Sequence, residues 1–348
     1  MRIRPTFPLV LAVVLVAAAV TVAVQLRKSA PPEPARLLPG ADAFLYVNLG
    51  WVRKLNPERT LPTVSHDPEY EQFIQQTGFE FERDLEAAAF AAHYPSNWAG
   101  GGTGGAAPEP RFSEVFIGKF DGVKLGAYLK QHAQSIENYQ SVDIFTIPLE
   151  GRSFRVAILG VDSVACSNHD DPAVIRGIVD RSRRLASPFG GPALLRRYYK
   201  RVQFASPLWI VAQVRPSAPA FGGWSAVFPK PADIVISTGY NPLRLPLRPS
   251  ALHLRAEALT ASPEDARSVA EKLNAYLTLF HSAEGSVGGP GTDADVKALF
   301  DSLQVRQEEN RATLSAVIPP GFLKKMLAES PAGVAAPGPQ PPAPSGSR

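Results

Sequence analysis

The sequence has a single cysteine, Cys166, so it cannot form an intramolecular disulfide bond and its fold must rest on a packed core. Cys166 lies in an alternating stretch that is typical of a strand, which predicts a small buried hydrophobe rather than a catalytic thiol. Because Cys166 is far from the N-terminus, lipid attachment at an N-terminal cysteine is also excluded. The chain has no Asn-x-Ser/Thr sequon, which suits a bacterial envelope protein.

Recognisable catalytic and metal-binding motifs are missing as well. The sequence has no Gly-x-Ser-x-Gly elbow, no His-Glu-x-x-His motif and no paired Cys-x-x-Cys. A glycine run at residues 100–105 lacks the Gly-Lys-Ser/Thr ending of a phosphate-binding loop. His169, beside Asp170 and Asp171, comes nearest to a metal cluster, and we interpret it as a loop that leads into a capped helix. The sequence therefore predicts a protein that is not an enzyme and uses no metal or cofactor.

One long hydrophobic run, residues 9–26, contains only Thr21 and Gln25 as polar residues. As a helix it would be about 27 Å long, close to the ~30 Å hydrocarbon core of a bilayer. Flanking positive charges favour a cytoplasmic N-terminus and an extracytoplasmic chain. The alternative is a cleavable signal peptide that ends at Ala23. Both interpretations export the remainder, which predicts a single-pass protein of the cell membrane whose bulk is periplasmic.

Composition divides the chain into successive segments. Residues 1–28 are the predicted transmembrane anchor or signal peptide, and residues 29–38 are a proline-rich linker. Residues 39–205 and 206–330 are long enough for two α+β modules. Residues 331–348 consist almost entirely of Pro, Ala, Gly and Ser, which predicts a disordered tail.

Hydrophobic periodicity predicts an α+β fold with an internal repeat. The order strand, helix, strand, strand, helix occurs at residues 114–182 and again at 252–329. The first helix of each unit contains the tripeptide Ala-Tyr-Leu, at residues 127–129 and 275–277. We therefore predict an N-terminal transmembrane helix followed by two similar modules, each an antiparallel sheet with helices packed on one face.

The start of the exported region resembles a known class of proteins. Residues 38–47 have the sequence Leu-Pro-Gly-Ala-Asp-Ala-Phe-Leu-Tyr-Val, and residues 77–79, Thr-Gly-Phe, are followed by Asp84 and Leu85. With the hydrophobic N-terminus and the spacer, this layout is similar to uncharacterised bacterial exported or membrane-anchored proteins of unknown function. The resemblance implies a duplicated α+β fold over most of residues 37–330, and it carries over no catalytic residue.

The strongest charge feature is a basic cluster between residues 176 and 201, which holds eight Lys and Arg but only one acid, Asp180. An anionic partner, such as a lipid headgroup or a phosphorylated envelope polymer, would fit this cluster. The alternative is two helices with solvated basic faces. Nucleic acid is not expected as a partner outside the cytoplasm. The cluster consists of Arg176, Arg181, Arg183, Arg184, Arg196, Arg197, Lys200 and Arg201.

These observations predict a non-catalytic binding or structural module of the bacterial envelope. It would contact the membrane through residues 9–26 and bind an envelope protein or an anionic lipid or polymer. One alternative is an extracytoplasmic hydrolase or transferase with dispersed catalytic residues that acts on an envelope polymer. Another is a carrier of an apolar ligand, suggested by Trp209, Trp224 and Phe228, unless these aromatics pack in the core and loops. The sequence leaves the oligomeric state open.

Overall fold

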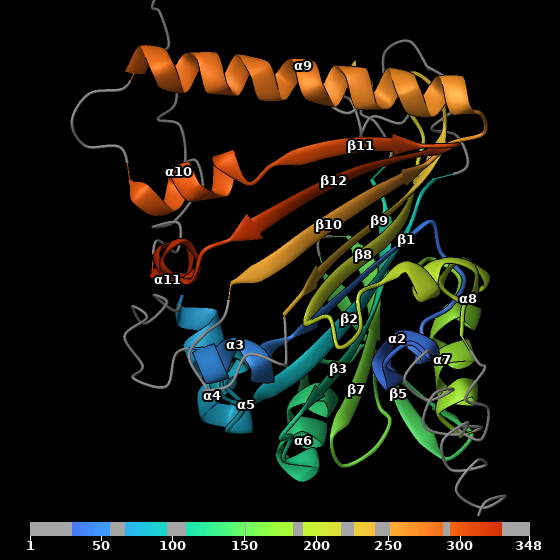
Figure 1. The fold of residues 1–348 in the computed structure, drawn as a ribbon. Coiled ribbons are helices and arrows are strands. Elements are labelled where there is room, and N and C mark those ends of the chain that lie inside the picture. Colours follow the sequence, from blue (N-terminus) through green and yellow to red (C-terminus); the bar gives the residue numbers. More distant parts are fainter. Residues whose placement is uncertain are drawn as a thin grey trace, which may run out of the picture.

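The computed structural model describes residues 30–55, 67–95, 109–149, 151–183, 191–216, 226–240, 251–287 and 293–328. These residues form one antiparallel sheet of 12 strands, in the order β11-β12-β10-β9-β8-β1-β2-β3-β7-β6-β5-β4 (Figure 1). The strands are β1 (Ala43–Asn48), β2 (Leu85–His93), β3 (Arg111–Gly118), β4 (Ser135–Tyr139), β5 (Val142–Leu149), β6 (Arg152–Ile158), β7 (Ser163–Ser167), β8 (Leu208–Val214), β9 (Ala232–Gly239), β10 (Leu252–Leu259), β11 (Gln304–Glu308) and β12 (Arg311–Ile318).

This continuous sheet corrects the prediction of two modules that each have their own sheet. Strand β1 pairs with β2 on one side and with β8 on the other, so Leu45 lies opposite both Phe90 and Ile210. Two separate sheets would expose four edges of unpaired backbone groups, whereas the joined sheet has only β4 and β11 at its edges. Hydrophobic alternation indicates where a strand lies but not which strand pairs with it. The pairing of β1 with β8 therefore could not be predicted from the sequence.

Helices cover both faces of the sheet, which corrects the prediction of helices on one face. On one face, α2 (Glu33–Leu37), α7 (Ala173–Arg183) and α8 (Ala193–Tyr198) pack against the central strands. On the other face lie α4 (Pro68–Thr77), α6 (Gly122–His132) and α9 (Pro263–Val287). The other helical elements among the described residues are α3 (Leu49–Leu55), α5 (Phe81–Asp84), the 3-10 helix η2 (Tyr199–Arg201), α10 (Ala294–Asp301) and α11 (Pro320–Ala328).

The strands need cover on both faces because several of them are apolar on both. Strand β8 buries Trp209 and Val211 in the core beneath α2, α7 and α8. The alternate residues Ala212 and Val214 are buried in the core beneath α9. Because successive side chains of a strand point to opposite faces, one layer of helices would leave half of these side chains in water.

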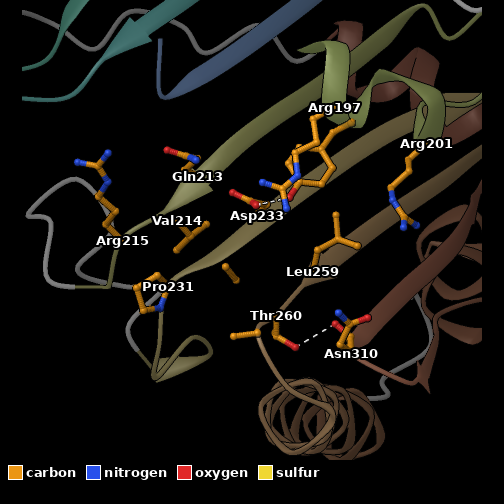
Figure 2. A pocket seen from close by; sticks show the side chains of 13 residues that line it. Arg197, Arg201, Gln213, Val214, Arg215, Pro231, Asp233, Leu259, Thr260 and Asn310 are labelled. Carbon is orange, nitrogen blue, oxygen red and sulfur yellow. Dashed lines mark hydrogen bonds between the residues drawn. The ribbon is translucent and has the colours of Figure 1, made fainter. Parts of the chain in front are cut away.

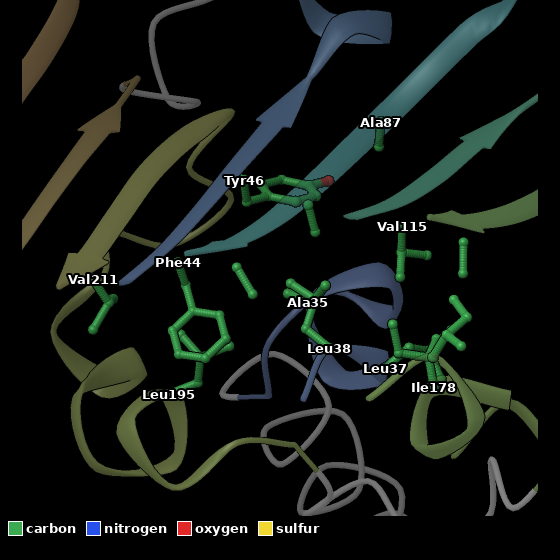
Figure 3. Close-up of a cluster of buried hydrophobic side chains, with 14 of the residues drawn as sticks. Ala35, Leu37, Leu38, Phe44, Tyr46, Ala87, Val115, Ile178, Leu195 and Val211 are labelled. Carbon is green, nitrogen blue, oxygen red and sulfur yellow. The ribbon is translucent and has the colours of Figure 1, made fainter. Parts of the chain in front are cut away.

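The largest core cluster lies between the sheet and helices α2, α7 and α8, and Figure 3 shows Phe44, Val211 and Leu195 facing one another within it. Trp209 is completely buried there, and Phe228 is buried in the core beneath α9. These two aromatics are therefore packing residues, while Trp224 lies outside the described residues. Cys166 is buried, as predicted from its alternating strand.

The hydrophobic residues 9–26, for which the sequence predicts a transmembrane helix, lie outside the described residues. Within the part of the chain that the structure describes, no helix is long and apolar enough to cross a membrane. The 25-residue helix α9 has the length, but it carries Glu264, Asp265 and further charged residues. The described residues thus form a sheet domain in which no transmembrane helix is shown.

The two units proposed to be a duplication share one topological feature. Strand β3 is followed by α6, and the chain returns through β7 to pair with β3. Strand β10 is likewise followed by α9, and the chain returns through β12 to pair with β10. Both helices lie on the same face of the sheet. The duplication itself stays a prediction.

Candidate functional site

A cleft of about 570 Å³ lies between the α8–η2 segment and the adjoining ends of β8, β9 and β10 (Figure 2). Helix α8 begins after Pro192, and its buried side chains Leu195 and Tyr198 fix it on the sheet. The Tyr198 hydroxyl donates a hydrogen bond to the carboxylate of Asp233 on β9. The cleft is lined by Arg197, Tyr198, Arg201, Gln213, Val214, Arg215, Pro231, Ala232, Asp233, Leu259, Thr260, Ala261 and Asn310.

Positive charge dominates this cleft, because Arg197, Arg201 and Arg215 line it against a single acid, Asp233. Arg215 is neutralised by an ion pair with Asp42, at 2.6 Å between Nη2 and Oδ1. Arg197 instead lies over the ring of the adjacent Tyr198, 5.0 Å from its centroid, and has no carboxylate partner among the described residues. The cleft therefore keeps a surplus of positive charge for an anionic group.

Asp233 and Tyr198 form a fixed polar wall rather than a reactive pair. Burial, together with the hydrogen bond to Asp233, raises the pKa of Tyr198 to about 12. The tyrosine hydroxyl consequently stays protonated at neutral pH and serves as a hydrogen-bond donor. Its bond to Asp233 joins the helix that carries Arg197 to strand β9.

A buried carboxylate, Glu257 of β10, positions the second arginine of the cleft wall. Glu257 is only 2% exposed, and it lies 3.5 Å from Arg201 and 3.5 Å from Arg311. Arg255 also donates to the Glu257 carboxylate. Because a buried carboxylate is stable only with hydrogen-bonding or charged partners, Glu257 holds these guanidinium groups beneath the η2 segment.

The α7 members of the basic cluster have structural partners. Arg176 forms an ion pair with Glu137 of strand β4, at 2.8 Å between Nε and Oε1. The Arg181 Nε donates to the carbonyl of Leu37, which ties α7 to α2. Arg183 donates to a carbonyl of the β4–β5 turn at 3.2 Å. These arginines hold neighbouring elements together, and none of them lines the cleft.

The α8–η2 members divide into two groups. Arg197 and Arg201, four residues apart, line the cleft. Arg196 and Lys200 are exposed on the same segment but do not line it. Arg184 lies outside the described residues. Of the predicted anionic-partner cluster, only Arg197 and Arg201 line the cleft, and the described α7 arginines lie away from it.

The other polar residues of this region were not predicted from the sequence. They are Gln213, Arg215, Asp233, Glu257 and Asn310. They come from strand ends and turns that are distant in sequence and become neighbours only in the sheet. A single local signal was present for Glu257, which is a carboxylate within the alternating strand Leu252–Leu259.

A second polar cluster joins His93, Ser113 and Ser167 at the ends of β2, β3 and β7. His93 Nε2 lies 3.0 Å from Ser113 Oγ, which lies 3.1 Å from Ser167 Oγ. Ser113 is 0% exposed and Ser167 only 2%, so neither hydroxyl can reach a substrate. The ring of His169 packs edge-on against His93, and its Nδ1 accepts a hydrogen bond from the Asp171 amide. Over the described residues, no group of three or more His, Cys, Asp or Glu could hold a metal ion.

His93 of this cluster and Glu114 of β3 are both partly buried. We expect their titrations to have opposite effects on stability as the pH changes. Burial and neighbouring His169 lower the pKa of His93 from 6.5 to about 4. Between pH 6.5 and pH 4, His93 is therefore mostly protonated in the unfolded chain and mostly neutral in the folded protein. Stability due to His93 is therefore complete above pH 6.5 and falls as the pH drops toward 4. Burial raises the pKa of Glu114 from 4.5 to about 6, so its contribution is present below pH 4.5 and is lost as the pH rises through 6.

We expect His93→Gln to flatten the loss of stability between pH 6.5 and 4, and Glu114→Gln to steepen it. Urea denaturation at pH 7, 6, 5 and 4 measures both effects, with the unsubstituted protein as the reference. Parallel stability profiles for all three proteins would contradict these assignments.

No family model matches this chain, and no curated protein matches its sequence. Solved structures with a similar arrangement include crystal forms I, III and IV of TP0453, with TM-scores of 0.38, 0.39 and 0.39. Their sequence identities are 8%, 8% and 9%, over 86% of this chain and 97–98% of theirs.

Proposed function

We propose that the protein is a non-catalytic binding protein of the bacterial envelope whose cleft binds a small ligand through an anionic group. The observation that carries this proposal is the pair Arg197 and Arg201 on the wall of a 570 Å³ cleft, where Arg197 has no carboxylate partner among the described residues. Guanidinium groups suit phosphate and carboxylate oxygens because they present several N–H donors in one plane. The cleft volume lies within the range of about 300–1,000 Å³ that is usual for small-molecule sites.

The proposed location rests on the hydrophobic residues 9–26, which favour export and contact with the membrane by their composition. An extracytoplasmic position would bring the cleft to anionic envelope components. The resemblance of residues 38–47 and 77–85 to uncharacterised bacterial exported proteins supports this proposal. Cell fractionation tests the location directly, because a protein found only in the cytoplasmic fraction would contradict it.

Binding is favoured over hydrolysis or group transfer by the chemistry of the cleft wall. Its described lining contains no His, Ser or Cys, and Thr260 Oγ1 is engaged with backbone carbonyls. Asp233 accepts the hydrogen bond from Tyr198, whose pKa is raised to about 12, so this hydroxyl stays protonated and is a weak nucleophile. An apolar ligand is disfavoured for a different reason, since it would cover Arg197 and Arg201 and remove them from water.

We expect Arg197→Gln to weaken binding of sn-glycerol 3-phosphate about 10-fold, since a hydrogen bond to a charged group contributes about 1.5–3 kcal/mol. Arg196→Gln is the matched control, because Arg196 is the exposed neighbour that does not line the cleft. Isothermal titration calorimetry measures both variants, and added NaCl should weaken binding by the unsubstituted protein.

The same titrations with inorganic phosphate and glycerophosphoglycerol test whether the anionic group alone is recognised. Saturable binding that Arg197→Gln weakens and Arg196→Gln preserves is the expected result. No saturable binding to any of these anions, or equal weakening by both substitutions, would overturn the proposed function.

A further inference from the structure

A second hollow, of about 280 Å³, adjoins the cleft at the turn between β11 and β12. Arg201 and Asn310 line both hollows, so the two hollows meet at these residues, and together we call them the groove. Figure 2 shows these two residues at the same side of the cleft, Arg201 from the η2 segment and Asn310 from the turn. The other residues that line the second hollow are Glu308, Glu309 and Arg311. A ligand longer than a single phosphate can therefore extend from the first hollow into the second.

The turn that closes the second hollow is held in place by backbone hydrogen bonds. The Asn310 carbonyl accepts from the Thr260 amide and from Thr260 Oγ1, both at 2.9 Å. The Glu309 backbone has a positive φ of 49°, and its carbonyl accepts from the side chain of Gln307 at 2.6 Å. The Glu309 side chain is consequently carried on a fixed turn at the end of the groove.

The sign of the charge changes along this groove. Arg197 at the α8 end has no carboxylate partner among the described residues, whereas Arg201 in the middle faces the buried Glu257. At the far end, Arg311 is paired with Glu308, and the exposed Glu309 carboxylate has no ion pair within the described part of the chain. The groove thus offers the unpaired guanidinium of Arg197 at one end, where the Asp233 carboxylate accepts from Tyr198, and the unpaired carboxylate of Glu309 at the other.

Resting on the proposed function, we propose that the ligand is a zwitterion that carries a phosphate and an ammonium group. Its phosphate contacts Arg197 and Arg201, and its ammonium group lies against Glu309. An extended polyanion fits the groove less well, because its second negative charge would approach Glu308 and Glu309. The ammonium group of a zwitterion instead gains from these carboxylates. The headgroup of an aminophospholipid and the corresponding free phosphodiester share this chemistry.

The proposal is tested with two phosphodiesters that differ in their cationic group. Glycerophosphoethanolamine carries an ammonium group, whereas glycerophosphoglycerol carries a hydroxyl and the same single negative charge. We expect glycerophosphoethanolamine to bind the full chain about 10-fold more tightly in isothermal titration calorimetry, a ratio that corresponds to about 1.4 kcal/mol.

Glu309→Gln should abolish this preference without weakening the binding of glycerophosphoglycerol, because it removes a negative charge and not an anion contact. The matched control is Glu271→Gln, which removes an exposed carboxylate of α9 on the opposite face of the sheet. Vesicles that contain phosphatidylethanolamine distinguish the two sources of the ligand. Binding to them that Glu309→Gln weakens assigns the site to a lipid headgroup, and binding of only the soluble diester assigns it to a free zwitterion.

Equal affinity for the two diesters, or a preference that survives in Glu309→Gln, would overturn the zwitterion while leaving the anion-binding cleft in place. If neither diester and no simple phosphate binds, the proposed function fails together with this inference. The glycerophosphoglycerol titration therefore separates the two failures.

Discussion

Replacing Trp209 by alanine is expected to lower the free energy of unfolding by about 3–5 kcal/mol, the usual range for a buried Trp or Phe. Trp209 is completely buried on β8. Its ring stacks on Tyr46 at a centroid distance of 5.6 Å and meets Tyr199 edge-on at 5.4 Å. Alanine would leave a cavity between Tyr46 of the sheet and Tyr199 of the segment that carries Arg201, so ligand affinity should fall as well. Urea denaturation measures the loss of stability.

Two controls separate packing from other causes. Trp209→Phe should cost less than alanine, because it keeps a ring and removes an indole nitrogen that is buried without a hydrogen-bond partner in the described structure. Val161→Ala, at a residue that is 88% exposed, should change stability by less than about 0.5 kcal/mol. A loss of less than 1 kcal/mol for Trp209→Ala would contradict the packing described for β8.

Replacing Glu257 by alanine is expected to cost about 3 kcal/mol, near the lower end of the range for breaking a buried ion pair. The Glu257 side chain is 2% exposed, and its removal leaves three guanidinium groups without their shared partner. The cost stays near the lower end because the side chains of Arg201, Arg255 and Arg311 are 39%, 44% and 25% exposed and can be hydrated.

Glu271→Ala on α9 is the control for this substitution, because it removes an exposed carboxylate. Thermal and urea denaturation should show a clear loss for Glu257→Ala and almost none for Glu271→Ala. Equal stability of the two variants would mean that Glu257 does not organise the arginines beneath η2.

Helix starts depend on local signals in the sequence, as the capped helix predicted after His169 illustrates. Asp67 accepts a hydrogen bond from the Tyr70 amide at 2.8 Å, as expected for an N-cap residue that precedes proline. Asp171 accepts from Ala173 at 2.8 Å, and Ser262 accepts from Asp265 at 3.2 Å. Such starts are visible in a sequence because donor and acceptor lie within three residues of each other, so no tertiary contact decides the outcome.

Features that depend on distant partners were missed. Strand β4 (Ser135–Tyr139) is short, largely polar and at an edge of the sheet, so it lacks the apolar alternation that marks a strand. The pairing of β1 with β8 joins residues more than 160 positions apart, such as Phe44 and Val211. No pattern within either strand specifies that neighbour, and the error in the predicted fold follows from this.

Only part of the candidate site was predicted from the sequence, because its residues come from segments that are distant in the chain. The density of positive charge predicted Arg197 and Arg201 as binding residues. It also predicted Arg176, which instead pairs with Glu137, 39 positions away. Only the folded sheet distinguishes an arginine that pairs with a neighbouring strand from one that faces a cleft. The acid that positions Arg201, Glu257, is 56 positions from it and was not predicted.

The proposed binding site requires that Arg197 and Arg201 contact the anion. Arginine Nε–Hε resonances, assigned by substitution and followed by NMR during a titration with glycerophosphoethanolamine, test that contact. We expect the resonances of Arg197 and Arg201 to shift and saturate, while that of Arg196 stays in place. Unchanged resonances for Arg197 and Arg201, or equal and unsaturated shifts of all exposed arginines, would contradict the proposed binding site.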